Sequence, residues 1–222
     1  FFNFEMKSLI TYLFFFFFSL SQITAQENIA IDSLQKVIAI TTDKKVKADA
    51  MVDMSVEYTN FDSPKAYEYA KQAIDFSQKI NYPRGIIEGM NSLATLENNR
   101  GNFSEALITL RDALILAEEA ADKSATARCF LNMGNIYSTL KNNQKAIDCY
   151  QKSYDLYYQN KDFDKSITSL NRIANRHMDI GNELNDTNYY FKAIKIYSKA
   201  FQIAVKINDK KKIINSYANM AD

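Results

Sequence analysis

The amino-acid sequence repeats itself with a period of about 40 residues, and this regularity restricts the possible folds more than any other feature. A small residue recurs in one series, and an alanine recurs in a second series that follows it after 11, 12, 12 and then 19 residues. The first series is Ser55, Ala94, Gly134, Ala174 and Ala221, and the second is Ala66, Ala106, Ala146 and Ala193. A period of this length is typical of solenoids, in which each repeat is one supersecondary unit.

Each repeat carries the apolar spacing of two helices. Phe130, Met133 and Tyr137 lie at i, i+3 and i+7 and form the stripe of a first helix. A second stripe starts at Ala146. Turn-forming residues separate the two stripes, at Asp62-Ser63-Pro64, Gly101-Asn102, Asn142-Asn143 and Gly181-Asn182. We therefore expect antiparallel helix hairpins, with the insertion at residues 183–188 forming a longer loop.

Two further features favour a stack of such hairpins. Helices that pack at about 8–10 Å admit only small residues at their closest point, which explains both small-residue series. An aspartate also recurs twelve residues before the small residue, where its side chain can accept hydrogen bonds from free N–H groups at a helix start: Asp43, Asp122, Asp162 and Asp209. Residues 26–46 carry one helix stripe and a turn, and we expect them to form a leading half-repeat.

This arrangement resembles the tetratricopeptide repeat. Repeat three matches its pattern of small and large residues with Phe130, Met133, Gly134, Tyr137, Ala146, Tyr150 and Ser153, and repeat two matches with Met90, Leu93, Ala94, Gly101, Phe103, Ala106, Leu110 and Ala113. The resemblance implies an all-α fold, a right-handed superhelical solenoid of antiparallel hairpins. Its repeats would span 47–86, 87–126, 127–166 and 167–213, with a truncated fifth at 214–222.

Besides the insertion at residues 183–188, the chain departs from the family pattern in two respects. Its period exceeds the usual value of about 34 residues. Glu97 and His177 also stand where an aromatic residue is expected. A 40-residue period suits HEAT repeats too, but the fixed interval between the two small-residue series favours the tetratricopeptide repeat.

The two ends of the chain carry different signals. Residues 1–5 precede the first Met and read as upstream reading frame. Residues 6–25 read as a signal peptide, because a lysine is followed by an apolar run too short to span a membrane and then by a small residue. Cleavage would leave Gln26 first and place the protein in the periplasm or cell envelope; an uncleaved anchor is the alternative. The fifth repeat stops within a helix and lacks a capping helix, so we expect more protein after Asp222.

The motifs that usually carry catalysis or cofactor binding are absent from the sequence. No GxxxxGK[ST], GxGxxG or GxSxG motif occurs. The one histidine, His177, lies in an apolar helix stripe, where a packed or groove-facing residue is expected. Cys129 and Cys149 should stay unbonded, because antiparallel packing offsets them by roughly 9 Å along the hairpin. The 27 basic and 26 acidic residues nearly cancel, which argues against nucleic-acid binding. We expect no enzyme, no cofactor and no metal site.

The surface of the first helices remains as a candidate site. In the tetratricopeptide repeat these helices line the concave side of the superhelix, so the resemblance implies a groove that binds a peptide. Asparagine and arginine concentrate at the corresponding positions, which are Asn91, Asn98, Arg128, Asn132, Asn135, Asn171, Arg172 and Asn175. An asparagine amide can pair with the backbone of an extended peptide of any sequence. The alternative is that asparagine is simply abundant in this chain. Only Asn132 and Arg172 match the carboxylate grip of chaperone-binding members, so that ligand class is disfavoured.

The sequence thus predicts an exported scaffold that binds another protein or peptide through its concave face. The alternative function is the N-terminal sensor segment of a membrane signal-transduction protein. Such a protein would be a histidine kinase or a repeat-bearing transcriptional regulator with its effector domain beyond residue 222. An apolar span of about 20 residues followed by a kinase domain would identify the second case.

Overall fold

The computed structural model describes residues 29–221, which form α-helices joined by short turns, with no strand among them. A helix over residues 29–40 comes first. The helices that follow in chain order are α2 (Lys44–Tyr58), α3 (Ser63–Lys79), α4 (Pro83–Asn99), α5 (Phe103–Glu119), α6 (Lys123–Thr139), α7 (Asn143–Gln159), α8 (Phe163–Leu184), α9 (Thr187–Lys206) and α10 (Lys210–Ala221).

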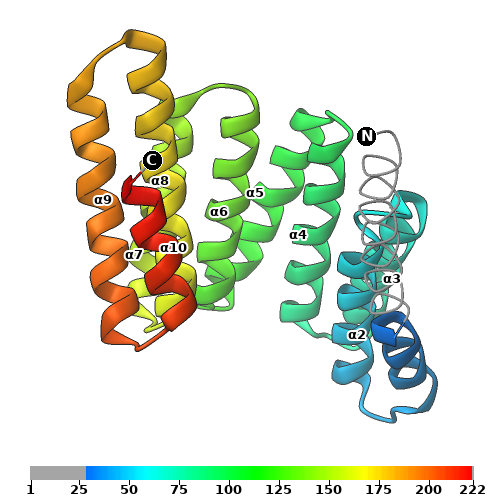
Figure 1. The fold of residues 1–222 in the computed structure, drawn as a ribbon. Helices are drawn as coiled ribbons and strands as arrows, with labels where there is room; N and C mark the ends of the chain where they lie inside the picture. Colours follow the sequence, from blue (N-terminus) through cyan, green and yellow to red (C-terminus); the bar gives the residue numbers. More distant parts are fainter. Residues whose placement is uncertain (1–28, 222) are drawn as a thin grey trace, which may run out of the picture.

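The helices stack as a row of hairpins from the N-terminal to the C-terminal end of the described chain (Figure 1). Every helix from α2 to α10 packs against the next one, and the first helices also contact one another, α2 with α4 and α4 with α6. The predicted all-α stack of helix hairpins is therefore confirmed. The first helices form one side of the stack, and the second helices α3, α5, α7 and α9 form the other.

The leading helix packs on the first hairpin through the stripe that the sequence indicates. Ile31 is 7% exposed and belongs to the same buried cluster as Met54 and Tyr58. Leu34 and Ile38 pack against that cluster from the same helix. Residues 29–40 thus cover part of the apolar side of α2.

The small residues lie where the helices cross most closely. The four alanines of the second series are 0% exposed, and Ser55 and Ala174 of the first series are equally buried. Gly134 shows the reason most directly, because a Cβ added there would lie 2.5 Å from Cε1 of Tyr150. Only glycine allows the Tyr150 ring of α7 to lie this close to the backbone of α6.

Aspartates cap the helix starts at the predicted turns. Asp122 accepts hydrogen bonds from the N–H groups of Ser124 and Ala125, and equivalent bonds are made by Asp43, Asp162 and Asp209. Repeat two is the exception, because Tyr82 stands at the cap position and its side chain makes no cap bond. There Pro83 begins α4, and its fixed φ and missing N–H suit a first turn.

The predicted longer loop at residues 183–188 is wrong. Helix α8 has 22 residues and α9 has 20, where α3 to α7 have 17 each, so the insertion lengthens the helices. The turn is tight and uses Asn185 with a φ of 51°. Gly181, expected to break the helix, lies inside it, where a Cβ would come within 3.1 Å of the Tyr190 ring. This glycine permits close packing between the lengthened helices.

Several expectations concern features outside the helix packing. The signal peptide predicted for residues 6–25 lies outside the described residues. Within residues 29–221, no helix combines the length and the apolar character needed to cross a membrane. Cys129 and Cys149 are both free.

Candidate functional site

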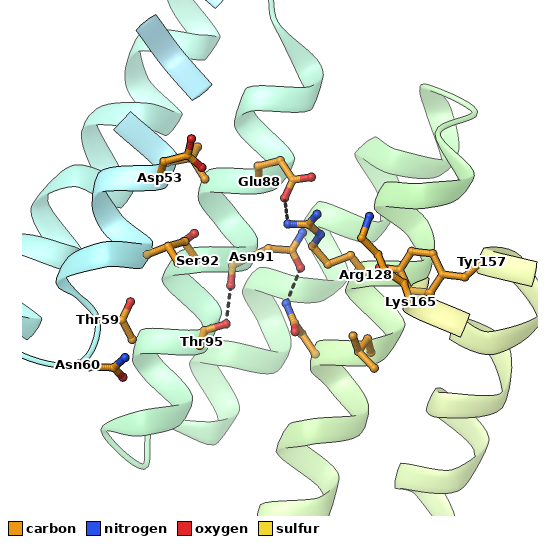
Figure 2. Close-up of a pocket in the computed structure, with 14 residues that line it drawn as sticks. Asp53, Thr59, Asn60, Glu88, Asn91, Ser92, Thr95, Arg128, Tyr157 and Lys165 are labelled. Atoms are coloured by element: carbon orange, nitrogen blue, oxygen red, sulfur yellow. Dashed lines mark hydrogen bonds and ion pairs between the residues drawn. The ribbon is translucent and has the colours of Figure 1, made fainter. Parts of the chain in front are cut away.

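A cavity of about 510 Å³ opens on the side formed by the first helices. Figure 2 shows side chains from α2, α4 and α6 around it, closed at one end by Tyr157 and Lys165. A second hollow of about 320 Å³ shares Asp53 and Val56 with it and extends to the leading helix. We call the surface of α2, α4, α6 and α8 that contains this cavity and continues beyond it along α8 the inner face.

An ion pair crosses the cavity wall from α4 to α6. Nη1 of Arg128 lies 2.7 Å from Oε2 of Glu88 (Figure 2). Burial raises the pKa of Glu88, and the Arg128 guanidinium acts in the opposite direction. Tyr157 reaches the same place from the end of α7, and burial raises its pKa to about 12. The hydroxyl of Tyr157 therefore stays protonated. Arg128, with smaller contributions from Arg84 and Lys165, supplies the positive charge that favours the Glu88 carboxylate.

Asn91 lies beneath the cavity with its amide fully used by the protein. It is 3% exposed, and its Nδ2 donates to the carbonyl oxygen of Ile87 at 3.0 Å. Its Oδ1 accepts from Nδ2 of Asn132 at 2.9 Å. This bond joins successive first helices and leaves Oδ1 of Asn132 with no donor among the described residues. Asn91 thus orients Asn132 at the cavity.

Asn135 and Asn175 are bound at the other end of the amide from Asn132, through Oδ1 instead of Nδ2. Oδ1 of Asn135 accepts a hydrogen bond of 2.9 Å from the hydroxyl of Tyr150, and Oδ1 of Asn175 accepts one from the hydroxyl of Tyr197. In both cases a tyrosine of a second helix binds the carbonyl end of the amide. The Nδ2 groups of Asn135 and Asn175 have no acceptor among residues 29–221, so each presents two N–H donors.

The remaining candidates have less regular surroundings. Asn98, Asn132 and Asn135 line a small hollow of about 30 Å³ between α4 and α6. Oδ1 of Asn98 and Oδ1 of Asn171 are buried and have no hydrogen-bond partner among the described residues. Arg172 is exposed, and no acidic group of the described chain forms an ion pair with it.

The predicted residues therefore fall into two groups. Asn91, Asn98, Arg128, Asn132 and Asn135 surround two adjoining hollows on α4 and α6. Asn171, Arg172 and Asn175 continue along α8 without lining either hollow.

The apolar residues that lie next to these asparagines on α6 and α8 are buried to different degrees. Ile173 is 2% exposed. Phe130 and Met133 are only half-buried. Phe130 carries the Lys152 ammonium group 5.0 Å from its ring centroid.

Sequence reasoning missed four ionisable residues of the cavity, Asp53, Glu88, Tyr157 and Lys165. Asp53 and Glu88 occupy the same positions relative to the small residue as Asn132 and Arg128, so the repeat alignment contained the signal. Tyr157 and Lys165 come from the end of α7 and the start of α8. No first-helix pattern includes them, because their approach depends on how successive hairpins stack.

Comparisons with known proteins agree with this architecture. Residues 86–159 match the tetratricopeptide repeat family. The chain is 30% identical over 115 residues to the heat shock protein STI1 of Saccharomyces cerevisiae, a match that covers 50% of this chain and 18% of that protein. This chain therefore aligns with less than a fifth of that relative's length.

Two solved structures are similar in fold. One is a Rap protein complexed with competence and sporulation factor, with a TM-score of 0.73 and 17% identity over 89% of this chain and 55% of that one. The other is a signal transduction ATPase (STAND protein) with a tetratricopeptide repeat sensor from Pyrococcus horikoshii. Its TM-score is 0.65 at 19% identity, over 91% of this chain and 31% of that one.

Proposed function

Since residues 86–159 match the tetratricopeptide repeat family and the described helices stack as a tetratricopeptide-like solenoid, we propose that the protein binds an extended segment of another protein along its inner face. The asparagines of α6 and α8 would pair with the backbone of that segment. The cavity of about 510 Å³ would accept its side chains. No reacting group is required, and the site acts by shape and hydrogen bonding.

The observation that carries this proposal is the opposite orientation of two amides on α6. Asn132 presents a carbonyl oxygen and Asn135, three residues later on the same helix face, presents N–H donors. An extended peptide residue offers one N–H donor and one C=O acceptor, so these two side chains complement its backbone. Asn175 offers the same donor one repeat further on. At about 1 kcal/mol net for each neutral hydrogen bond, binding would be modest and readily reversible.

The test uses peptides selected on the wild-type protein from a phage-displayed library of random 12-residue sequences. A matched control is available, because replacing Asn135 or Asn175 alone would also remove the partner of a tyrosine hydroxyl. Tyr150→Phe with Tyr197→Phe keeps both asparagines and removes only the internal bonds. Adding Asn135→Ala and Asn175→Ala to that variant then removes the inner-face amides without leaving a hydroxyl behind.

We expect the selected peptides to bind the double phenylalanine variant within a few-fold of wild type. The quadruple variant should lose about tenfold or more in affinity, since about two hydrogen bonds disappear. Its thermal midpoint should match that of the double variant. Equal binding by both variants would contradict a role for these amides.

We propose as a second candidate function that the repeats sense a ligand for a larger signalling protein. Support comes from the fold likeness to the STAND protein with a tetratricopeptide repeat sensor, of which this chain covers 31%. Reading the gene beyond residue 222 tests it. An apolar span of about 20 residues followed by a kinase or DNA-binding domain would support it, and a stop codon close by would contradict it.

We also propose that the protein is exported, on the strength of the signal-like residues 6–25. Export predicts a mature N-terminus at Gln26. Mass spectrometry of the protein from the periplasmic fraction checks this, and a mature chain that starts at Met6 would contradict cleavage.

A further inference from the structure

Charge on the inner face changes sign from one end of the stack to the other. Two residues before the small residue of each repeat, a position that we call the first row, the sequence reads Asp53, Ser92, Asn132 and Arg172. Six residues before the small residue, in the second row, it reads Asp49, Glu88, Arg128 and Thr168. Both rows begin acidic in the N-terminal repeats; the first row ends in the basic Arg172, and the second is basic at Arg128 and neutral at Thr168. Asp53, Ser92 and Asn132 all line the same cavity.

The charged residues of the second row, and Lys165 beside them, already have hydrogen-bond or ion-pair partners within the protein. Glu88 and Arg128 pair with each other at 2.7 Å. Asp49 accepts a hydrogen bond of 3.1 Å from the hydroxyl of Tyr82. Lys165, at the end of the cavity, pairs with Asp162 at 2.7 Å. None of these groups needs a ligand for its charge balance.

The two ends of the first row have no such direct partner. Asp53 and Arg172 form no ion pair and no side-chain hydrogen bond with any residue in the range 29–221. Burial raises the pKa of Asp53 and the neighbouring carboxylate of Asp49 raises it further, while the Arg128 guanidinium lowers it by a smaller amount. A nearby cation would therefore stabilise the Asp53 carboxylate. Val52 and Val56 flank Asp53 at the cavity and offer apolar contact to the stem of a lysine or arginine side chain.

We infer that the segment bound on the inner face carries a basic side chain that meets Asp53 and an acidic side chain that meets Arg172. This inference rests on the proposed peptide binding and adds the charge order of the ligand. Asp53 is on α2 and Arg172 on α8, three first helices further along. Helices pack about 8–10 Å apart, which gives roughly 25–30 Å between the two charges. An extended peptide advances about 3.3 Å per residue, so the two charged residues lie roughly eight positions apart.

The same random 12-residue library tests the inference, because a segment of that length spans about 40 Å. Wild-type selections should enrich peptides with one Lys or Arg and one Asp or Glu near that spacing. Asp53→Asn should abolish the basic preference and Arg172→Gln the acidic preference, each change weakening a selected peptide about two- to fivefold. Both residues are exposed, so neither variant should lose stability. Glu118→Gln and Arg111→Gln, exposed on the second helix α5, are the matched controls.

A charge-exchanged variant makes the test reciprocal. Asp53→Lys combined with Arg172→Glu should select peptides in which the two charges have changed places relative to the asparagine contacts. Enriched peptides without a charge pattern, or a pattern that persists in Asp53→Asn and Arg172→Gln, would overturn this inference and leave peptide binding intact. No enrichment by the wild-type protein would instead contradict the proposed function, and the inference with it.

Discussion

The hydroxyl of Tyr150 donates a 2.9 Å hydrogen bond to Oδ1 of Asn135, and this bond fixes which end of the asparagine amide a ligand meets. The tyrosine belongs to α7 and the asparagine to α6, so a second helix orients a side chain of the inner face. Tyr197 and Asn175 repeat the relationship between α9 and α8. Helix packing and ligand contact are therefore coupled in these two repeats.

A double-mutant cycle should detect that coupling. Asn135→Ala leaves the buried Tyr150 hydroxyl without this acceptor, at a cost of about 1–3 kcal/mol. The cost should fall near the lower limit, because the Ser138 side chain also acts on the Tyr150 hydroxyl and lowers its pKa. Tyr150→Phe alone should cost about 1 kcal/mol, and the double variant less than the two single costs together. Urea denaturation measures all three, and strictly additive values would show that the bond contributes nothing.

Gly134→Ala tests the close approach of α6 and α7. The new Cβ would lie 2.5 Å from the Tyr150 ring, so the ring or a helix must shift. We expect a loss of about 1–3 kcal/mol in the free energy of unfolding. Thr139→Ala, at an exposed position of the same helix, should stay within about 0.5 kcal/mol of wild type. A Gly134→Ala protein as stable as wild type would contradict the crossing geometry.

Arg128→Gln should create a pH-dependent loss of stability. Burial raises the pKa of Glu88 in the folded protein, so the native state holds its proton more tightly than the unfolded chain does. Charging Glu88 therefore costs stability as pH rises through the ordinary range of a glutamate and up to the folded pKa. Without Arg128, the urea midpoint should fall relative to wild type between pH 4 and pH 7. Adding Glu88→Gln should remove that fall, and its persistence would exclude Glu88 as the cause.

His177→Phe should change stability in the opposite pH direction. Burial lowers the pKa of His177, and the nearby Lys192 lowers it further. The native state thus binds the proton less tightly, and stability is full above the ordinary pKa of 6.5 and declines as pH falls through the folded pKa. Nδ1 of His177 is also buried without a partner among the described residues. Phenylalanine should raise the thermal midpoint and reduce its decline between pH 7 and pH 5.5; an unchanged decline would implicate other groups.

The sequence predicted the hairpins because each local signal agreed with the others. Helix stripes, aspartate caps and buried alanines at fixed intervals all require the same stacking. The loop at residues 183–188 was predicted wrongly because Gly181 reads as a breaker in isolation. Its place in a helix depends on the Tyr190 ring, which the sequence does not position.

The candidate site was predictable only in part. Positions on the first helices follow from the repeat, but the direction of an amide does not. Asn91 and Asn132 have the same residue type and both line the cavity, yet Asn91 is 3% exposed with both ends of its amide bonded, whereas Asn132 is half-buried and presents its carbonyl oxygen. That difference arises from a hydrogen bond between residues 41 positions apart. Local spacing cannot specify it.

The most direct measurement of the central claim follows the side-chain amide resonances of the inner face by ¹⁵N NMR. A peptide selected on the wild-type protein is titrated in, and Asn→Ala variants assign the signals of Asn132, Asn135 and Asn175. We predict saturable shifts of these side-chain amides. The backbone amides of exposed second-helix positions such as Glu118 should be unaffected. Shifts confined to α5, α7 or α9, with all three asparagine side chains unchanged at saturation, would contradict binding on the inner face.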